Sequence, residues 1–515
     1  MNGAESLVCS LLNSDVDMCF TNPGTSEMHF VAALDKKKEL RCVLGLFEGV
    51  VTGMADGYGR MADKPAATLL HLGPGLANGL ANLHNAKKAN TPIVNIIGEH
   101  ATHHIKLDAP LTSDIEGIAT PVSDWVKTSR LPSELEEDAA EAISIAKTAP
   151  GKISSLILPA DVAWGEAKYR GIVKSIPILR PIPQSQTTKI ANVLSSGKRN
   201  LIHLTGRALR CETLELLGKI QAKTGCRLSC MTSNSRWQRG AGRVSIERIQ
   251  YPIDIALKQL SDVENIVLLG TPLPVSFFAY PDKPSVLIPK SCKVFQWAEK
   301  GDDIVSAISD LVDELDANSK KALIQESKKP ILRTGELSLE AISCAIGNLI
   351  PENAIFVDES VSSGRGFMPF TEGSNPHDWL ALTGGSIGLG LPMATGASIA
   401  CPDRKVICAE GDGSAMYTIQ SLWTQARESC DVVNIIFNNR GYSILKDEFK
   451  NVGANNMGAN ASRMMKLTDP AINWLSLSNS LGVPATCSKT ADEFNLQLER
   501  ALNSPGPHLI EAVIS

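Results

Sequence analysis

An aspartate flanked by two glycines, Asp412, lies in the motif Gly411–Ser414 directly after the apolar run KVICAE. An isolated Asp-Gly pair usually marks a turn, because Asp caps helices and Gly adopts positive φ. Here a second polar motif follows 27 positions later, where the apolar run VVNIIF leads to Asn439 and Gly441. Because the carboxyl ends of parallel strands lie together, we expect the two motifs to meet in one crevice.

These two motifs offer the oxygen ligands that magnesium prefers. The Asp412 carboxylate, the Asn439 side-chain oxygen and the Gly441 carbonyl would supply half of an octahedral shell, which Mg²⁺ usually completes with phosphate oxygens and water. We expect a helix to begin at Ala415 and to present Ser414 and its N–H groups to a phosphate. The sequence therefore predicts that Asp412 is a metal ligand that holds a diphosphate at the edge of a sheet.

The elements that must position these residues follow one pattern throughout the chain. Short buried strands alternate with amphipathic helices, which predicts an α/β fold of parallel sheets flanked by helices. A chain of 515 residues is too long for one core, and a proline-rich stretch near residue 185 and a charged stretch at 316–333 interrupt the pattern. We expect three domains, at residues 1–170, 185–320 and 335–515. The expected strands are Met18–Asn22, Cys42–Phe47, Ala66–His71, Ile93–Gly98 and Ser154–Pro159, then Asn200–Thr205, Arg227–Met231, Asn265–Gly270, Ser285–Pro289 and Lys293–Gln296, and finally Ala354–Val357, Lys405–Ala409, Val432–Asn438 and His508–Val513.

Composition excludes several classes of function. The net charge is −5 and aromatic residues make up 5% of the chain, so neither a long-range field nor a stacking surface favours nucleic acid. The N-terminal segment lacks a basic region and no run of 18 apolar residues occurs, so we expect no secretion signal and no membrane span. The 12 cysteines are scattered, mostly in apolar stretches, as in reduced proteins. We predict a cytoplasmic protein that binds neither nucleic acid nor membranes.

The GDGS and NN-x-G motifs, at this spacing, resemble the cofactor motif of thiamin-diphosphate enzymes. The whole chain is similar to the decarboxylase and acetolactate synthase group of that family, and most of all to benzoylformate decarboxylase-like enzymes. The family has a pyrimidine-binding, a middle Rossmann-like and a diphosphate-binding domain, which correspond to the three segments above. The resemblance implies thiamin diphosphate and Mg²⁺ as cofactors and a homodimer or homotetramer with the active site between subunits. FAD is not expected, although some relatives carry it in the middle domain without a readable signature.

The resemblance also assigns residues to the cofactor. A carboxyl group in a dry pocket must hydrogen-bond to N1′ of the pyrimidine, and Glu48, between CVLGLF and GVVTGMADGYGRM, stands at that position. Taken alone, Glu48 would be an N-terminal helix residue favoured by the helix dipole. In GGSIGLGLPMATG, Ile387 corresponds to the bulky wedge that bends the cofactor, and the Gly385 carbonyl would accept from its amino group. The other implied cofactor contacts are Gly411, Asp412, Gly413, Ser414, Asn439, Gly441, Tyr442 and Ile444.

Two further residues correspond to catalytic positions of the family. Thr25, in NPGTSE, aligns with the substrate-binding serine of benzoylformate decarboxylase. His71, in LLHLGPG, aligns with a histidine that shuttles protons on reaction intermediates, although a lone histidine at a strand end is more often structural. Together with Glu48, these are the predicted catalytic residues. The predicted substrate pocket consists of Thr25, Ser26, His71, Phe277, Phe278 and Leu445.

Several positions depart from the patterns of known subfamilies. Phe277 stands where benzoylformate decarboxylase has a second active-site histidine, and a phenylalanine cannot relay a proton. Leu445 replaces a glutamate of pyruvate decarboxylases, whose paired histidines correspond here to Thr112 and Ser113. Acetolactate synthases usually have Gln where this chain has Gly49.

The resemblance leads to one main function and two alternatives. The main prediction is decarboxylation of a 2-oxo acid to an aldehyde or a ligated product, on an apolar substrate. The first alternative is an acetolactate synthase-like carboligase, because the loss of the relay histidine would leave time for a second carbonyl compound to react. The second is a regulatory paralogue that binds the cofactor without turnover, against which the retained Glu48, His71, Asp412 and Asn439 argue.

Overall fold

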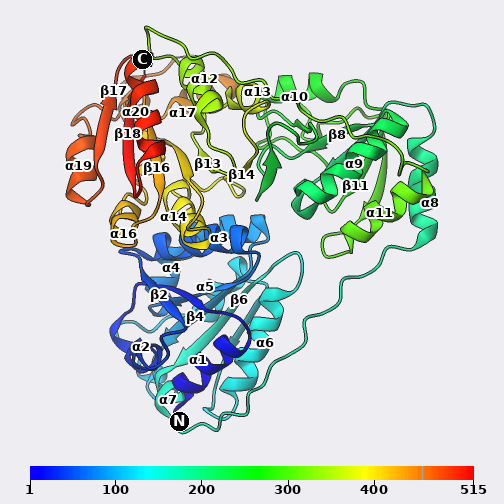
Figure 1. Ribbon diagram of the computed structural model, residues 1–515. Coiled ribbons are helices and arrows are strands. Elements are labelled where there is room, and N and C mark those ends of the chain that lie inside the picture. The colour runs from blue at the N-terminus through cyan, green and yellow to red at the C-terminus, as the bar shows by residue number, and fades with distance from the viewer. Residues whose placement is uncertain (455, 515) are drawn as a thin grey trace.

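The chain forms three sheets flanked by helices, as the computed structural model shows for residues 1–454 and 456–514 (Figure 1). The N-terminal part lies at the bottom of Figure 1, the middle part at the upper right and the C-terminal part at the upper left. The predicted α/β fold with three parallel-sheet units is confirmed. The predicted limits of the domains stay predictions, and residue 515, the predicted end of the last one, lies outside the described residues.

The N-terminal sheet is parallel throughout and has the order β2-β1-β3-β4-β6-β5. Helices α1, α2, α6 and α7 cover one face, and α3, α4 and α5 cover the other. The strands are β1 (Met18–Thr21), β2 (Arg41–Leu44), β3 (Ala66–Leu70), β4 (Ile93–Glu99), β5 (Trp125–Thr128) and β6 (Ile153–Pro159). The helices are α1 (Gly3–Asn13), α2 (Met28–Asp35), α3 (Glu48–Ala62), α4 (Leu72–Ala89), α5 (Ile115–Ala119), α6 (Leu135–Lys147) and α7 (Ala160–Trp164).

A long segment without helix or regular strand, residues 168–183, crosses from the N-terminal part to the middle part (Figure 1). The middle sheet that follows has the order β10-β8-β7-β11-β12 and is parallel. Its strands are β7 (Asn200–Leu204), β8 (Arg227–Cys230), β10 (Glu247–Arg248), β11 (Asn265–Leu269) and β12 (Lys293–Ala298). Its helices are α8 (Gln184–Leu194), α9 (Cys211–Thr224), α10 (Ile253–Leu260) and α11 (Ile304–Glu314).

The C-terminal sheet has the order β17-β18-β16-β15-β13-β14-β9. Its last strand, β9 (Trp237–Arg239), comes from the middle third of the chain and pairs antiparallel with β14, so this sheet joins two parts of the sequence. The other strands are β13 (Ile355–Glu359), β14 (His377–Ala381), β15 (Val406–Gly411), β16 (Val432–Asn438), β17 (Ala485–Ser488) and β18 (His508–Val513). The helices are α12 (Leu339–Leu349), α13 (Phe367–Thr371), α14 (Gly390–Ala400), α15 (Asp412–Ala415), α16 (Ser421–Arg427), α17 (Ser443–Asn451), α18 (Ala459–Met464), α19 (Trp474–Ser480) and α20 (Ala491–Asn503).

Thirteen of the fourteen expected strands are present, with ends shifted by a few residues. The strand expected at Ser285–Pro289 is wrong: Val286 makes only an isolated bridge to Val275. Pro284 precedes this segment and Pro289 ends it, and proline cannot donate to a strand ladder. The sequence pattern missed β5, β9, β10, β14 and β17, which are short or made of mixed polar and apolar residues.

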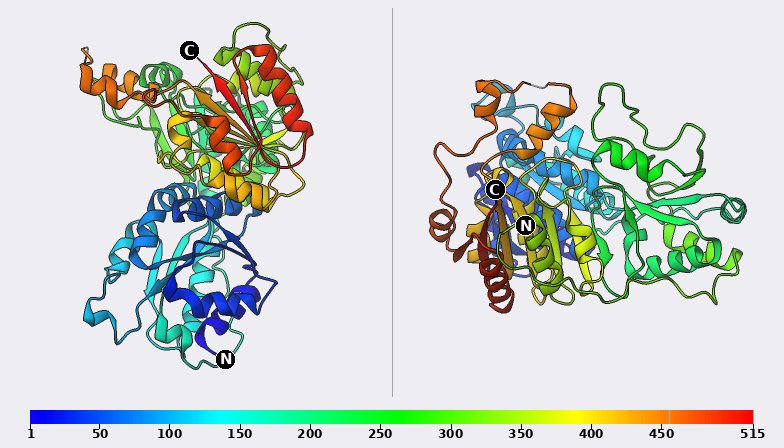
Figure 2. Two further views of the ribbon diagram at one scale, coloured as in Figure 1. Left: turned by 90° about the vertical axis from the view of Figure 1, so that its left-hand side faces the viewer. Right: turned by 90° about the horizontal axis from the view of Figure 1, so that it is seen from above.

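Helix α3 packs against α14 at very close range, which joins the N-terminal and C-terminal parts (Figure 1). A Cβ atom at Gly57 of α3 would lie 2.1 Å from the Met393 carbonyl oxygen, and one at Gly396 of α14 would lie 2.0 Å from the Met54 carbonyl oxygen. Figure 2 shows from the side how the blue N-terminal helices meet the yellow ones. The two backbones can approach this closely only because both positions are glycine.

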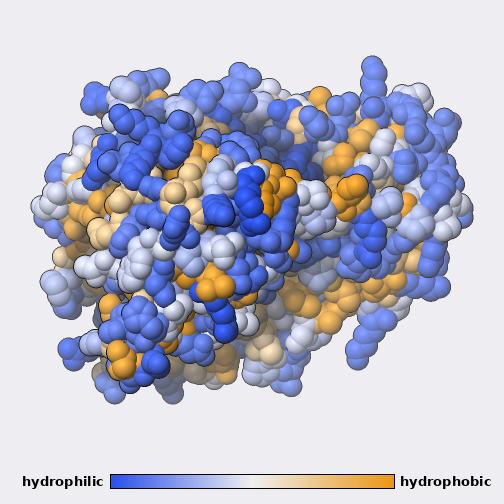
Figure 3. Space-filling view, turned by 90° about the horizontal axis from the view of Figure 1, so that it is seen from below, coloured by the Kyte–Doolittle hydropathy of each residue, from blue (hydrophilic) through white to orange (hydrophobic). Residues whose placement is uncertain are grey.

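The molecular surface carries apolar side chains scattered among polar ones on the face seen in Figure 3. No helix in residues 1–454 and 456–514 is both long and apolar enough to cross a bilayer. All twelve cysteines are free thiols in the described part of the chain.

We predict that Gly57→Ala lowers the free energy of unfolding by about 1–3 kcal/mol, because the added methyl group forces α3 and α14 apart. The control is Gly458→Ala, where nothing lies within 4 Å of an added Cβ atom. Thermal unfolding followed by circular dichroism should show a lower melting temperature for Gly57→Ala only. Equal melting temperatures for the two variants would contradict the close contact.

Candidate functional site

A pocket at the carboxyl edge of the C-terminal sheet brings the two sequence motifs together. Loops that follow β13, β15 and β16 form its walls, together with the loop before α14 and the start of α17. The lining residues are Ser360, Val361, Ser362, Ser363, Ile387, Gly411, Asp412, Gly413, Ser414, Asn439, Gly441, Tyr442, Ser443 and Ile444. All predicted cofactor contacts except Glu48 and Gly385 therefore line one pocket. The serine-rich loop after β13 belongs to it too, and the sequence reasoning missed this loop, although it follows a buried strand.

The carboxylate of Asp412 lies beside the side-chain oxygen of Asn439. The backbone N–H of Gly441 donates to both, to Asp412 Oδ2 at 3.2 Å and to Asn439 Oδ1 at 3.0 Å, so the two oxygens share one donor. Asp412 is 3% exposed, and burial raises the pKa of its carboxyl group, while hydrogen bonds from Gly413 and Gly441 partly offset that rise. A cation placed next to these oxygens would favour the ionised carboxylate.

Helix α15 begins at Asp412, three residues before the expected start at Ala415. The reason is local: Gly411 is extended and ends the strand, and Asp412 Oδ1 accepts from the Gly413 N–H at 2.8 Å within the first turn. The ring of Tyr442 covers Gly413, where a Cβ atom would lie 2.3 Å from the ring. The Ser414 hydroxyl donates to the Gly411 carbonyl at 3.1 Å. Glycine at position 413 thus allows the Tyr442 ring to pack directly on the first turn of α15.

The loop that carries Ile387 into the pocket depends on glycines with positive φ. Gly385 has φ +77° and Gly388 has φ +96°, values that favour glycine over other residues. A Cβ atom at Gly385 would lie 2.6 Å from the Phe277 ring, so Phe277 of the middle part packs against this loop.

Glu359, which the sequence reasoning missed, holds the same loop from behind. Its carboxylate accepts hydrogen bonds from the backbone N–H groups of Gly388, at 2.5 Å, and of Gly390. It is 2% exposed, and burial raises the pKa of Glu359 to about 7, an effect that the backbone donors reduce. A second buried carboxyl group, that of Glu410, also lies against Gly390.

The predicted catalytic residues gather at the carboxyl edge of the N-terminal sheet. Glu48 is the first residue of α3, is buried, and accepts from the Asn78 side chain at 3.0 Å. A Cβ atom at Gly75 would lie 3.1 Å from both Glu48 Oε1 and His71 Cβ, so Glu48 and His71 flank one glycine. The Ser26 hydroxyl lies 3.4 Å from His71 Nδ1, and Thr25 precedes it in the same short turn.

A buried carboxylate that the sequence reasoning missed, Glu27, orients His71. Glu27 Oε2 lies 2.9 Å from His71 Nδ1, which leaves Nε2 of the ring as the nitrogen that can exchange a proton. Glycines shape this site. A Cβ atom at Gly24 would lie 2.0 Å from the His71 ring, and one at Gly98 would lie 1.8 Å from the Glu27 carboxylate. The glycine at the end of an otherwise apolar strand, Gly98, was the sequence signal that could have revealed the pair.

Asn82 of α4 connects the two groups of residues within the chain. Its side-chain amide donates to the Gly49 carbonyl at 2.7 Å, directly after Glu48, and to the Gly388 carbonyl at 3.1 Å, directly after Ile387. Yet Glu48, His71, Thr25 and Ser26 do not line the pocket that contains Asp412.

The predicted substrate-pocket aromatics lie on the surface of the middle part. Phe277 and Phe278 are 53% and 54% exposed, and their ring centroids are 5.1 Å apart. Tyr251 packs on Phe277 at 5.4 Å and donates from its hydroxyl to Glu448 of α17 at 3.1 Å. Leu445 is exposed on the same helix. This aromatic cluster therefore lies between the loop that carries Ile387 and helix α17.

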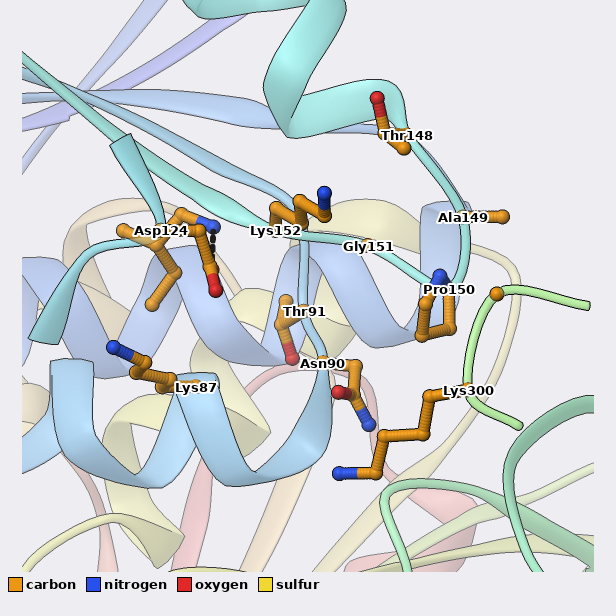
Figure 4. Close-up of a pocket in the computed structure, with 12 residues that line it drawn as sticks. Lys87, Asn90, Thr91, Asp124, Thr148, Ala149, Pro150, Gly151, Lys152 and Lys300 are labelled. Atoms are coloured by element: carbon orange, nitrogen blue, oxygen red, sulfur yellow. Dashed lines mark hydrogen bonds between the residues drawn. The ribbon is translucent and has the colours of Figure 1, made fainter. Parts of the chain in front are cut away.

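Another pocket, of about 370 Å³, lies between the N-terminal and middle parts, at the amino ends of β4 and β6 (Figure 4). Lys87, Lys152 and Lys300 line it, but so do the ends of α4 and α6, whose carbonyl groups attract cations. Lys87 already donates to the carbonyl oxygens of Pro121 and Ser123 at 3.0 and 2.9 Å. This pocket contains no predicted site residue.

Two models of known protein families match the chain. Residues 1–118 match the thiamine pyrophosphate enzyme N-terminal TPP-binding domain, and residues 363–512 match the thiamine pyrophosphate enzyme C-terminal TPP-binding domain. The first match contains Glu48 and His71, and the second contains Ile387, Asp412 and Asn439.

Known proteins resemble the chain over its whole length. A Mycobacterium tuberculosis protein named provisionally as acetolactate synthase large subunit IlvX is 45% identical over 100% of this chain and 99% of its own. Benzoylformate decarboxylase from Pseudomonas aeruginosa is 26% identical over 96% of this chain and 95% of its own. The solved structure of the thiamine diphosphate-dependent 4-hydroxybenzoylformate decarboxylase from Rhodococcus jostii has a TM-score of 0.86 at 23% identity, covering 99% of this chain and 98% of that one.

We predict that Glu359→Gln weakens the pH dependence of stability. Glu359 has a pKa of about 7 in the folded protein and an ordinary value of 4.5, so its contribution to the free energy of unfolding is full below pH 4.5 and is lost as pH rises towards 7. The free energy of unfolding of the variant does not contain this pH-dependent contribution. Any destabilisation caused by the packing of the amide is the same at each pH. Melting temperatures measured between pH 4.5 and 7.5 should therefore fall less steeply for Glu359→Gln than for the wild type.

The control for this measurement is Glu352→Gln, which replaces an exposed glutamate. Its pH profile should follow that of the wild type. Parallel profiles for the wild type and Glu359→Gln would show that Glu359 does not titrate in this range.

Proposed function

The chain belongs to the thiamine pyrophosphate enzyme family, and we propose that it decarboxylates a 2-oxo acid with the help of Mg²⁺ and gives an aldehyde or a ligated product. That it is an enzyme dependent on thiamine pyrophosphate follows from the family. The observation that carries the proposal is the single pocket that unites Ile387, Gly411–Ser414, Asn439, Gly441, Tyr442 and Ile444.

The residues of this pocket fit a metal-bound diphosphate. Asp412 Oδ2 and Asn439 Oδ1 share one N–H donor, so a single cation could contact both, with the Gly441 carbonyl as a third hard oxygen ligand. The backbone N–H of Ser414, in the first turn of α15, would bind a phosphate oxygen, since the Gly413 N–H already donates to Asp412. In the hydrogen bonds described above, the buried Asp412 carboxylate accepts from backbone N–H groups and from no cationic side chain. A metal ion would supply the positive charge.

When bound, thiamin diphosphate would supply a nucleophilic carbon that adds to the keto group and takes up the electron pair released with CO₂. Glu48 would hold a proton at N1′ of the pyrimidine, and its burial at the start of α3 keeps water away from this proton. Ile387, on a loop fixed by Glu359 and Asn82, would press on the cofactor and set its conformation.

His71 is the group that would move protons on the substrate side. Its Nδ1 is paired with Glu27, so Nε2 is available to donate to or accept from a reacting oxygen or carbon. The Thr25 hydroxyl would bind the substrate carboxylate, and Ser26, whose hydroxyl donates to Glu27, would lie beside it.

We also propose that the complete site lies between two copies of the chain, in a homodimer or homotetramer. Glu48 and His71 gather at one sheet edge and Asp412 and Asn439 at another, and the pocket of the second group has no lining residue from the N-terminal part. Two copies related by a twofold axis would bring the N-terminal edge of one to the C-terminal edge of the other.

We also propose a cytoplasmic location, because all twelve cysteines in the described residues are free thiols.

A carboligase is the second candidate function. Phe277, which packs on Gly385, brings an apolar ring to the place where the family has a proton-relaying histidine, so protonation by a side chain from this position is lost. The 45% identical relative is named as an acetolactate synthase, which supports the same alternative. The exposed Phe277, Phe278 and Leu445 support an apolar substituent on the substrate in either case.

The experiment that tests the function is product analysis. The purified protein is incubated with thiamin diphosphate, Mg²⁺ and a panel of 2-oxo acids, including pyruvate and benzoylformate, and products are identified by mass spectrometry. An aldehyde with CO₂ supports decarboxylation, and a 2-hydroxy ketone or acetohydroxy acid supports ligation. Absence of CO₂ release from every acid would contradict both and favour the regulatory paralogue.

We predict that Glu48→Gln lowers the turnover number by about 10²-fold or more, because the amide cannot exchange a proton with N1′. Thiamin diphosphate should still bind, since its diphosphate contacts lie elsewhere. The matched control is Glu39→Gln, at an exposed position before β2, which should retain full activity. Unchanged turnover in Glu48→Gln would remove Glu48 from the mechanism.

A further inference from the structure

Two cysteines outside the proposed site lie side by side on neighbouring strands. Cys19 of β1 and Cys42 of β2 are direct partners in the parallel register. The next pair in the register, Phe20 and Val43, packs toward α3 and α4, so the alternation of side chains turns Cys19 and Cys42 together to the opposite face, toward α1 and α2. Adjacent strands lie about 4.8 Å apart, which is within the Cα separations that disulfides span.

The two thiols differ sharply in their surroundings. Cys19 is fully buried in the cluster under α1 and α2, whereas Cys42 is exposed on β2, the edge strand of the sheet. The Cys42 thiol donates only a long hydrogen bond, at 3.5 Å, to the Leu40 carbonyl. Core packing explains Cys19, but it does not explain an exposed cysteine next to it.

The neighbouring thiol also changes the acidity of the exposed one. The interaction with the Cys19 thiol lowers the pKa of Cys42, and the same interaction, together with burial, raises the pKa of Cys19. A thiolate is therefore formed more easily on the side that solvent reaches, and a protonated thiol stands beside it. Exposed thiolates are the form of cysteine that peroxides oxidise.

We propose that Cys42 is a site of oxidation by peroxides and that Cys19 is its resolving partner, so that the two form a disulfide within the chain. The Cys42 thiolate attacks hydrogen peroxide, the O–O bond breaks, and sulfenic acid and hydroxide are formed. The Cys19 thiol then attacks the sulfenic sulfur, its proton leaves with the hydroxyl group as water, and the S–S bond forms. Peroxide is the oxidant and the two thiols are the reductant.

The edge position of β2 makes this second step possible. β2 has only one neighbouring strand, β1, so it can shift toward Cys19 without breaking a second ladder. No other two cysteines are register partners among the strands of residues 1–454 and 456–514. The chain continues from β2 through Gly45 to Glu48, so the bond would fix the strand that leads into the proposed catalytic glutamate.

The test is peptide mapping of the folded full-length protein after exposure to hydrogen peroxide. In the wild type we expect a Cys19–Cys42 linked peptide that dithiothreitol removes. In Cys19→Ser the sulfenic acid on Cys42 has no resolving thiol, so dimedone should label Cys42. Cys42→Ser should give neither product. The control is Cys401→Ser, which alters a partly buried thiol whose pKa is raised by burial and should behave as the wild type.

Two results would overturn the proposal. One is a wild-type protein in which Cys19 and Cys42 both remain thiols while other cysteines are oxidised. The other is a disulfide-linked Cys19 peptide in Cys42→Ser, which would mean that Cys19 pairs with a different cysteine. The wild-type peptide map shows by itself whether Cys19 and Cys42 become linked. The proposal can therefore be rejected even if Cys19→Ser does not fold.

Discussion

One backbone N–H group, that of Gly441, organises the proposed cofactor site. It donates to both Asp412 and Asn439, and it can do so because β15 and β16 are parallel neighbours whose carboxyl ends lie at the same height. Reversal of one strand would place the two oxygens at opposite ends of the pair, and each residue of register shift would move them apart by about 3.3 Å. The register of these two strands therefore sets the positions of the proposed metal ligands, which in turn would place the diphosphate.

Contacts elsewhere in the chain connect this site to the residues proposed as catalytic. Close glycine contacts hold α3 against α14, and Asn82 joins the residue after Glu48 to the residue after Ile387. Glu359 fixes the same loop from the other side. The start of the helix with the proposed proton-transfer group and the loop with the proposed wedge are thus held to one another by hydrogen bonds, not by flexible side-chain packing.

Most strands and the residues that line the pocket could be predicted from the sequence, because strand periodicity and the two polar motifs are local features. Asp412, Asn439 and Ile387 follow or precede recognisable apolar runs, and the structure collects them in one pocket. Glu27 and Glu359 could not be found in this way, since their roles depend on partners 44 and 29 residues away. β9 was missed for the same reason: its three residues become a strand only because the distant β14 pairs with them.

Calorimetric titration with thiamin diphosphate would show whether Asp412 binds the metal that holds the diphosphate. We expect the wild type and the exposed control Asp403→Ala to bind the cofactor in the presence of Mg²⁺ and to lose affinity with a chelator. Asp412→Ala should show no Mg²⁺-dependent binding. If Asp412→Ala binds thiamin diphosphate with wild-type affinity and magnesium dependence, Asp412 is not a metal ligand.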